Sequence, residues 1–151
     1  MLEVDRPADM KAYEGQTIGT SEWVLVDQPM INAFADATGD HQWIHVDVER
    51  AKQELPGGTT IAHGYLTLSL LPRLGEMIYR IRNTSRAINY GTGKVRFTAP
   101  VPSGSRVRLH YHLKSVEAIS GGVRLTFDST VELEGSDKPA LVAEALFLAF
   151  D

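Results

Sequence analysis

The sequence contains no cysteine. This absence excludes a disulfide framework, a thiolate nucleophile and a cysteine-based metal site. It also favours, weakly, a reducing compartment, where disulfides are rare.

Long apolar runs are missing as well. No stretch approaches the roughly 20 apolar residues that a membrane-spanning helix needs. The N-terminus, Met1–Pro7, lacks the basic-then-apolar pattern of a secretion signal. We therefore expect a cytoplasmic protein with no membrane partner.

Excess positive charge is also absent. The formal net charge is −4 at pH 7, which argues against a general nucleic-acid binder. Basic residues do gather in the window from Arg73 to Arg96, whose only acid is Glu76. Two interpretations stay open for this window: solvated helix ends and strand faces, or a patch for an anionic ligand such as a phosphorylated cofactor.

The length and composition of the chain are those of a single domain. The 151 residues are an ordinary domain length, and 43% hydrophobic with 23% charged residues is typical of a globular protein with a sizeable core. We find no internal repeat, low-complexity segment or linker, and we treat residues 1–151 as a single domain.

The hydrophobic pattern predicts helices in the first half and strands in the second. Residues 1–15 read as a loosely ordered lead-in. Before residue 85 we expect a strand at 17–26, helices at 28–38, 48–55 and 61–71, and an amphipathic segment at 74–81. From Ala87 the period changes to two, which predicts antiparallel strands at 89–98, 106–116, 123–133 and 141–150.

The helix at 61–71 is apolar on nearly every face, so we expect it to be buried all round until Pro72 ends or kinks it. Four long antiparallel strands and one buried helix predict an α+β fold, with the sheet curling around the helix. The remaining sheet edge is often protected by pairing two subunits.

The candidate chemistry lies between residues 34 and 71. Asp40 and His45 stand five residues apart just beyond Gly39, which stops the preceding helix. A carboxylate and an imidazole can share one water for acid–base work. Gly64 follows His63 at the head of the apolar helix, where a free amide can receive a developing oxyanion.

Each of these residues also has a plainer interpretation. Capping or a surface salt bridge would explain an Asp and a His at this spacing. Three roles stay open for His63: it caps the helix, it packs in the core, or it takes a direct part in catalysis. Glycine in a helix costs about 1 kcal/mol against alanine, so Gly64 needs a reason, which tight packing also supplies.

Two other site types fit the sequence poorly. Asp40, His41, His45 and His63 can cluster, but adjacent Asp40 and His41 have poor geometry for one ion. There is also no His-Glu-x-x-His helix. A serine hydrolase is disfavoured because no Gly-x-Ser-x-Gly elbow is present.

The segment Gly39-Asp40-His41-Gln42-Trp43-Ile44-His45-Val46-Asp47 resembles the motif of the MaoC-like, R-specific enoyl-CoA hydratases, which have the hot-dog fold. That motif runs small residue, Asp, any, Asn, Pro, any, His, any, Asp. Asp40 and His45 fall on the catalytic positions, and His63-Gly64 falls on the His-Gly pair of the central helix. Gln42 replaces Asn, which puts an amide one methylene further out, and Trp43 replaces Pro, which adds bulk beside the acyl pocket.

The resemblance implies a homodimer that adds water syn to trans-2-enoyl-CoA and gives (R)-3-hydroxyacyl-CoA, or runs the reverse dehydration. It implies no metal and no cofactor besides the coenzyme A of the substrate. Asp40 and His45 would be catalytic, as a coupled pair whose base and acid the sequence does not distinguish. Gly64, His63 and Gln42 would bind the oxyanion or the substrate, and Arg80, Arg82, Arg86 and Lys94 would contact the coenzyme A phosphates.

Two alternatives remain open. A hot-dog acyl-CoA thioesterase would direct a carboxylate-activated water at the thioester carbon instead of C3. A non-catalytic acyl-CoA-binding dimer would bind without turnover. One fold hosts many activities, so the fold does not choose among these.

Overall fold

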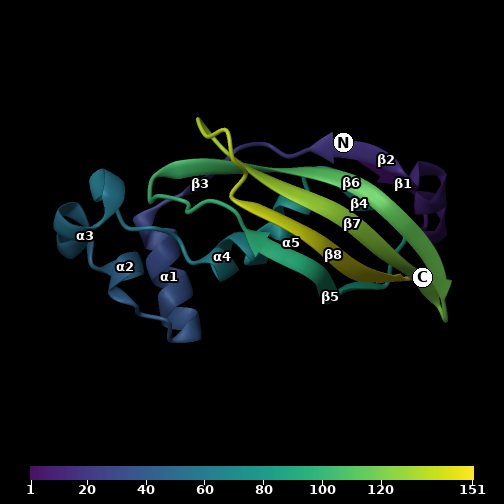
Figure 1. Cartoon of the computed structure of the whole chain (residues 1–151). Coiled ribbons are helices and arrows are strands. Elements are labelled where there is room, and N and C mark those ends of the chain that lie inside the picture. The colour runs from purple at the N-terminus through teal and green to yellow at the C-terminus, as the bar shows by residue number, and fades with distance from the viewer.

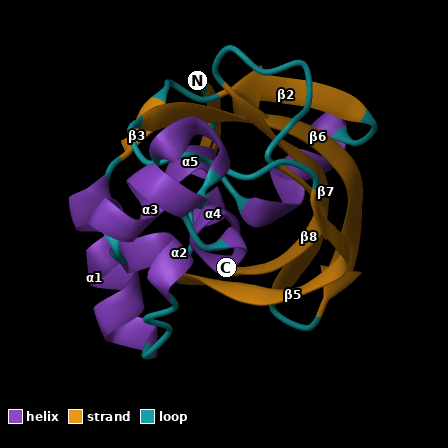
Figure 2. Ribbon diagram, turned by 60° about the vertical axis from the view of Figure 1, so that its left-hand side comes forward, coloured by secondary structure: helices purple, strands orange, loops and turns teal.

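A strongly curved antiparallel sheet forms the body of the computed structural model, which describes all 151 residues (Figure 1). Its strand order is β2-β6-β7-β8-β5, and β3 extends the sheet along β6. These strands are β2 (Gln16–Thr20), β3 (Val24–Val26), β5 (Arg86–Phe97), β6 (Ser105–Ile119), β7 (Gly122–Leu133) and β8 (Leu141–Phe150). The sheet curls around two short helices, as Figure 2 shows, so the predicted α+β hot-dog architecture is confirmed.

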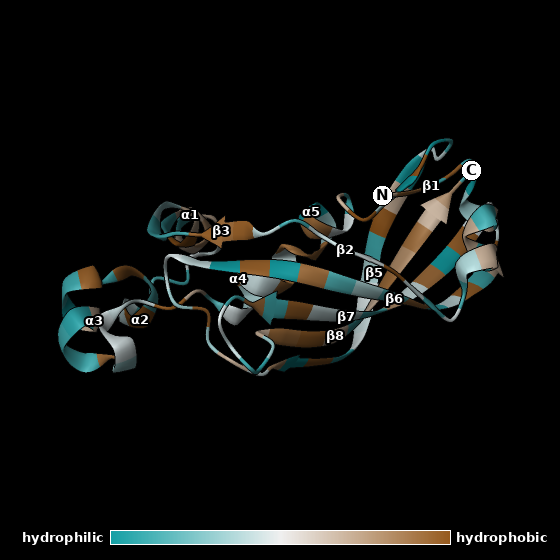
Figure 3. Cartoon of the chain, turned by 90° about the horizontal axis from the view of Figure 1, so that it is seen from above, coloured by the Kyte–Doolittle hydropathy of each residue, from teal (hydrophilic) through white to brown (hydrophobic).

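The alternating sequence pattern places one face of the sheet in the core. Val107, Leu109 and Leu113 of β6 are fully buried, and Leu125 and Phe127 of β7 pack beside them. Charged residues alternate with these along the same strands, and Figure 3 makes the alternation visible as bands of colour. The predicted strands at 106–116 and 123–133 are therefore confirmed, and β8 is the central strand that its apolar sequence predicts.

The central helix is shorter than the prediction. Helix α4 (Gly64–Ser69) begins three residues late, and α5 (Leu71–Gly75) follows it after a break that precedes Pro72. Ile61 and Ala62 stay extended because their amides donate to Ile44 (3.0 Å) and Val101 (2.8 Å). The helix is also not buried all round, since its second residue, Tyr65, is 68% exposed.

The predicted strand at 17–26 is interrupted. Ser21 stands between β2 and β3, and its Oγ accepts a hydrogen bond from the amide of Leu109 (2.9 Å) while its own amide donates to the Leu109 oxygen (2.8 Å). A side-chain oxygen thus takes the place of a backbone carbonyl in the ladder, and the chain turns outward before β3.

The lead-in is more ordered than the sequence indicated. β1 (Leu2–Val4) pairs in parallel with β4 (Tyr79–Ile81), so the expected amphipathic segment at 74–81 ends as a strand. A 3-10 helix, η1 (Pro7–Tyr13), follows and places Met10 in the core with no exposed surface.

Helix α1 (Gln28–Thr38) begins and ends where the sequence predicted. At one end of the sheet it packs with α2 (Trp43–Val46), which α3 (Val48–Glu54) and the 3-10 turn η2 (Pro56–Gly58) follow (Figure 1). No helix of the structure combines the length and the apolar character that crossing a membrane requires.

The cap of α1 supports a stability prediction. Asp27 Oδ1 accepts a hydrogen bond from the amide of Met30 (3.1 Å). We expect Asp27→Ala to lower the free energy of unfolding by about 1 kcal/mol, the usual value of such a cap. Urea denaturation followed by circular dichroism measures this difference. Asp27→Asn, which keeps the acceptor, is the control, and an equal loss in both variants would contradict the capping explanation.

Candidate active site

The end of α1 positions Asp40. Gly39 adopts the left-handed conformation (φ +81°) and its amide closes the helix on the Ala35 oxygen (2.8 Å). Asp40 follows directly, and its Oδ1 accepts the backbone amide of Gln42 (3.3 Å). The carboxylate is exposed, on a loop that directly follows a packed helix.

The imidazole of His45 is buried and held in one orientation. Its Nδ1 lies 2.7 Å from the backbone oxygen of Ile61. A carbonyl only accepts, so Nδ1 carries the proton and Nε2 keeps its lone pair in the neutral ring. A carboxamide also fixes the backbone of His45: Gln28 Nε2 donates to the His45 oxygen (2.7 Å), and Thr60 donates to Gln28 Oε1 (2.5 Å).

His63 lies directly beneath His45. The two rings stack with centroids 3.8 Å apart and planes 23° apart. His63 Nε2 donates to the backbone oxygen of Asp40 (2.9 Å), which leaves Nδ1 with a lone pair, buried and without a partner. The Nε2 proton is thus engaged within the chain, and a role of His63 in binding the oxyanion or the substrate stays a prediction. The side chain makes no capping bond.

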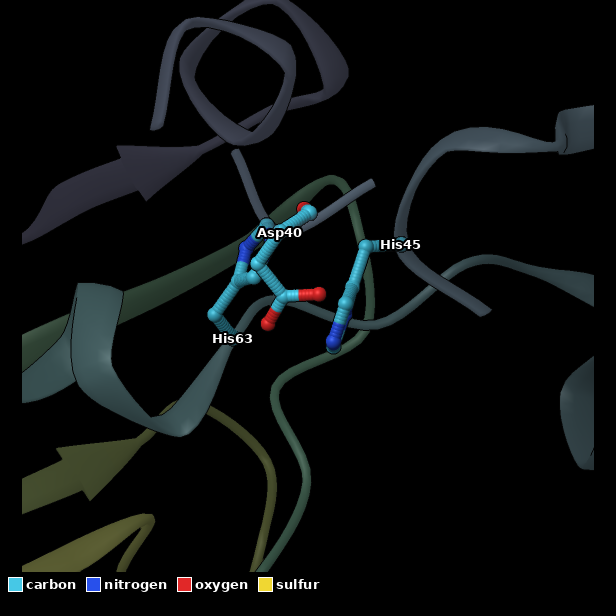
Figure 4. A group of neighbouring side chains, drawn as sticks. All are labelled: Asp40, His45 and His63. Carbon is cyan, nitrogen blue, oxygen red and sulfur yellow. The ribbon is translucent and has the colours of Figure 1, made fainter. Parts of the chain in front are cut away.

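Figure 4 shows the carboxylate of Asp40 beside the two imidazoles. One polar atom from each of Asp40, His45 and His63 lies within 4.8 Å of the others. The nearly parallel stacking of the rings does not suit a metal ion, because in-plane lone pairs of stacked rings do not converge on one point. The ligand atoms of Asp40 and His45 lie no more than 4.8 Å apart, a separation that one hydrogen-bonded water molecule can bridge.

Gly64 brings a free amide to the same place. It is the first residue of α4, and its amide donates no hydrogen bond within the chain. A Cβ at this position would lie 2.9 Å from the Phe97 ring, so close packing is a second reason for glycine. His45, Gly64 and Phe97 line one cavity of about 270 Å³. His45 and Gly64 thus line one cavity, and a carboxylate oxygen of Asp40 lies within 4.8 Å of a ring nitrogen of His45.

Comparison with known proteins identifies the family. A model of the MaoC-like domain matches residues 9–133. The chain belongs to the MaoC-like dehydratase family. The sequence-based expectation of a dehydratase-class enzyme is thereby confirmed.

Individual relatives agree with the family. The chain is 56% identical over 147 residues to 3-hydroxyacyl-thioester dehydratase Z of Mycobacterium tuberculosis, covering 97% of both chains. It is 44% identical over 144 residues to nodulation protein N of Rhizobium meliloti, covering 94% of this chain and 89% of that one. Among solved structures, R-hydratase PhaJ1 of Pseudomonas aeruginosa superposes with a TM-score of 0.73 at 21% identity, covering 91% of this chain and 82% of that one.

The two departures from the MaoC-like motif lie away from the cavity. Gln42 is exposed, and only its backbone contacts Asp40. Trp43 lies under the guanidinium of Arg50, 3.9 Å from the ring centroid, and does not line the cavity. An effect of Trp43 on the acyl pocket and a substrate-binding role for the Gln42 side chain both stay predictions.

In this MaoC-like chain, the four residues expected to bind the coenzyme A phosphates differ in position and in whether their charge is already paired. Arg82 is paired with Glu3 (2.5 Å) and Asp5 (3.2 Å); hydrogen bonding to Glu3 raises the pKa of Arg82, and it has no free charge to offer. Arg86 lies over the ring of Phe150, at the opposite end of β5 from Phe97. The 12 residues of this strand span roughly 35 Å. Lys94 is exposed near the Phe97 end, and Arg80 lines a separate cavity of about 430 Å³.

Sequence reasoning missed Gln28 and Thr60. They lie 32 residues apart and bond to each other only because α1 packs beside the segment that leads into α4. No local pattern marks either residue, although the polar Gln28 in the first turn of a capped helix is an available signal.

Proposed function

We propose that this protein hydrates trans-2-enoyl-CoA to (R)-3-hydroxyacyl-CoA, or catalyses the reverse dehydration, without a metal or a bound cofactor. The observation that carries the proposal is that the His45 imidazole and the free Gly64 amide share one cavity, with the Asp40 carboxylate beside that imidazole. The name of its relative of 56% identity, a 3-hydroxyacyl-thioester dehydratase, supports a thioester substrate.

The mechanism follows from the free atoms of the site. Water is held between the Asp40 carboxylate and the lone pair of His45 Nε2. Its oxygen bonds to C3 of the enoyl thioester, one of its protons passes to the Asp40–His45 pair, and the C2–C3 double bond moves toward the carbonyl. The Gly64 amide donates to the resulting oxyanion. The pair then returns a proton to C2, and delivery from the same face makes the addition syn.

Hydration of crotonyl-CoA tests the function. We expect enoyl absorbance to fall with no release of free thiol, both followed in one cuvette with a thiol reagent. Thiol release from saturated and unsaturated acyl-CoA would instead support the thioesterase alternative. Tight binding with neither change, across several chain lengths, would support the non-catalytic alternative.

We also propose that two copies pair through β5. This strand bonds only to β8, so its other edge offers a row of free backbone groups. Ile88, Tyr90 and Phe97 on it are 42%, 58% and 47% exposed, an unusual apolar surface for an uncovered edge. A two-fold axis that runs between the two copies of β5, perpendicular to the sheet, makes the two strands antiparallel. The result is a homodimer.

Such pairing has a consequence for coenzyme A. Antiparallel copies of β5 place the start of one strand beside the end of the other, so Arg86 of the second copy approaches the Phe97 end where the cavity opens. Arg80, on the neighbouring β4, belongs to the same end as Arg86. We infer that the phosphates bound at one active site contact Arg80 and Arg86 of the other copy, together with Lys94.

Subunit mixing tests this arrangement. We expect the double variant Arg80→Ala/Arg86→Ala to raise KM for crotonyl-CoA roughly five- to tenfold at unchanged kcat, since exposed ionic contacts contribute up to about 1 kcal/mol each. A hybrid of that chain with an Asp40→Asn chain should recover the wild-type KM at about half the kcat. A hybrid that keeps the raised KM would place these arginines at their own chain's site. Crotonyl-N-acetylcysteamine, which lacks the phosphates, is the control substrate.

A further inference from the structure

The proposed mechanism leaves one buried ionisable side chain without a task. His63 is 2% exposed, lies at the start of α4 and forms no cap. Burying an imidazole with an unpaired nitrogen has a cost, because its Nδ1 loses water and gains no partner. A phenylalanine or leucine would fill the space without that cost, so packing alone does not account for a histidine here.

The contacts of His63 reach both catalytic residues. Its Nε2–H donates to the backbone oxygen of Asp40 (2.9 Å), and its ring face covers the ring of His45 at a centroid distance of 3.8 Å. On its other side the ring of Phe34 packs at 4.9 Å. Asp40 comes from the loop after α1 and His45 from α2, and no hydrogen bond joins the side chains of Asp40 and His45 directly.

We infer that His63 is a positioning residue that sets the separation and orientation of Asp40 and His45. This inference rests on the proposed hydratase function. The hydrogen bond holds the loop of Asp40 against the head of α4, and the stacked ring stops His45 from turning toward the space beneath it. The hydrogen bond requires a proton on Nε2 of His63, since a carbonyl oxygen accepts but does not donate. The residue therefore acts on the reaction through its neighbours, without touching the reacting atoms.

Two substitutions separate the two contacts. His63→Phe keeps a ring for stacking and removes the N–H. His63→Gln keeps an amide N–H at about the position of Nε2 and removes the ring. We expect His63→Phe to lower kcat for crotonyl-CoA at least ~30-fold with KM within about twofold of wild type, because Asp40 is released while substrate contacts persist. We expect kcat of His63→Gln to be at least ~fivefold higher than kcat of His63→Phe.

The outcomes discriminate. Wild-type kcat in both variants would overturn the positioning role, and so would equal losses in the two variants. An inactive wild-type protein would instead reject the proposed function and leave these ratios undefined. The position of the proton provides a readout independent of turnover and of variant folding: ¹⁵N imidazole spectra of the unaltered protein should show His63 protonated on Nε2. A His63 protonated on Nδ1 alone would overturn the inference whatever the activity of the variants.

Discussion

Replacing Asp40 by Asn, or His45 by Gln, should lower kcat for crotonyl-CoA hydration at least ~100-fold while the protein stays folded. The loss follows because a positioned acid–base group typically contributes 10²–10⁴ in rate, and neither amide transfers a proton at neutral pH. Asn and Gln keep the size and part of the hydrogen bonding of the original side chains, so substrate binding should change little. Initial rates from enoyl absorbance, with thermal melts as a check on folding, measure the effect.

Matched controls for these variants lie in the same segment. Asp36→Asn changes an exposed carboxylate one helical turn before Asp40, and His41→Gln changes the exposed imidazole with which Asp36 pairs at 3.0 Å. Hydrogen bonding to Asp36 raises the pKa of His41, but neither group belongs to the cluster of Asp40, His45 and His63. Both control variants should keep near wild-type activity. Near-normal turnover in Asp40→Asn and His45→Gln as well would reject their assignment.

Removing the amide proton of Gly64 should lower the rate of crotonyl-CoA hydration by a factor similar to that expected for the Asp40 and His45 variants. Proline at this position is compatible with the backbone: Gly64 is the first residue of α4, where proline is favoured, and His63 before it is extended (ψ 137°). Gly64→Pro should therefore preserve the helix and delete the oxyanion donor. The loss of one such donor costs about 10²–10³ in rate.

Gly64→Ala separates this electronic effect from crowding. Alanine and proline both bring a Cβ to within about 3 Å of Phe97, but only alanine keeps the N–H. Phe97 is 47% exposed and can swing outward. We therefore expect Gly64→Ala to lose no more than ~10-fold in kcat/KM and Gly64→Pro to lose at least ~100-fold beyond that. Equal losses in the two variants would mean that the space at Gly64 matters and its amide does not.

The sequence predicted those parts of the fold that depend on local pattern. The alternation around Leu109 and Phe127 gave the faces of β6 and β7, and Asp27 and Gly39 marked both ends of α1. Asp40 and His45 could be selected because a helix stop precedes them and a His-Gly pair follows.

Long-range partners explain what the sequence did not predict. Ile61 joins no helix because its amide and oxygen are bonded to Ile44 and to His45 Nδ1, neither of which is visible in its local sequence. Ser21 interrupts a strand by bonding to Leu109, which is 88 residues away. The tautomers of His45 and His63 follow only from the carbonyls that face them. Side-chain contacts at the site therefore required the three-dimensional structure, whereas the choice of Asp40 and His45 as candidate catalytic residues did not.

Hydration of crotonyl-CoA in D₂O tests the central claim most directly. If one water is activated between Asp40 and His45 while the Gly64 amide holds the thioester oxygen, both new bonds form on one face. The product should then be R at C3 and should carry one deuterium at C2, syn to the new hydroxyl, as read by NMR and chiral chromatography. An S alcohol, anti placement of the deuterium, or release of free coenzyme A without hydration would contradict this account.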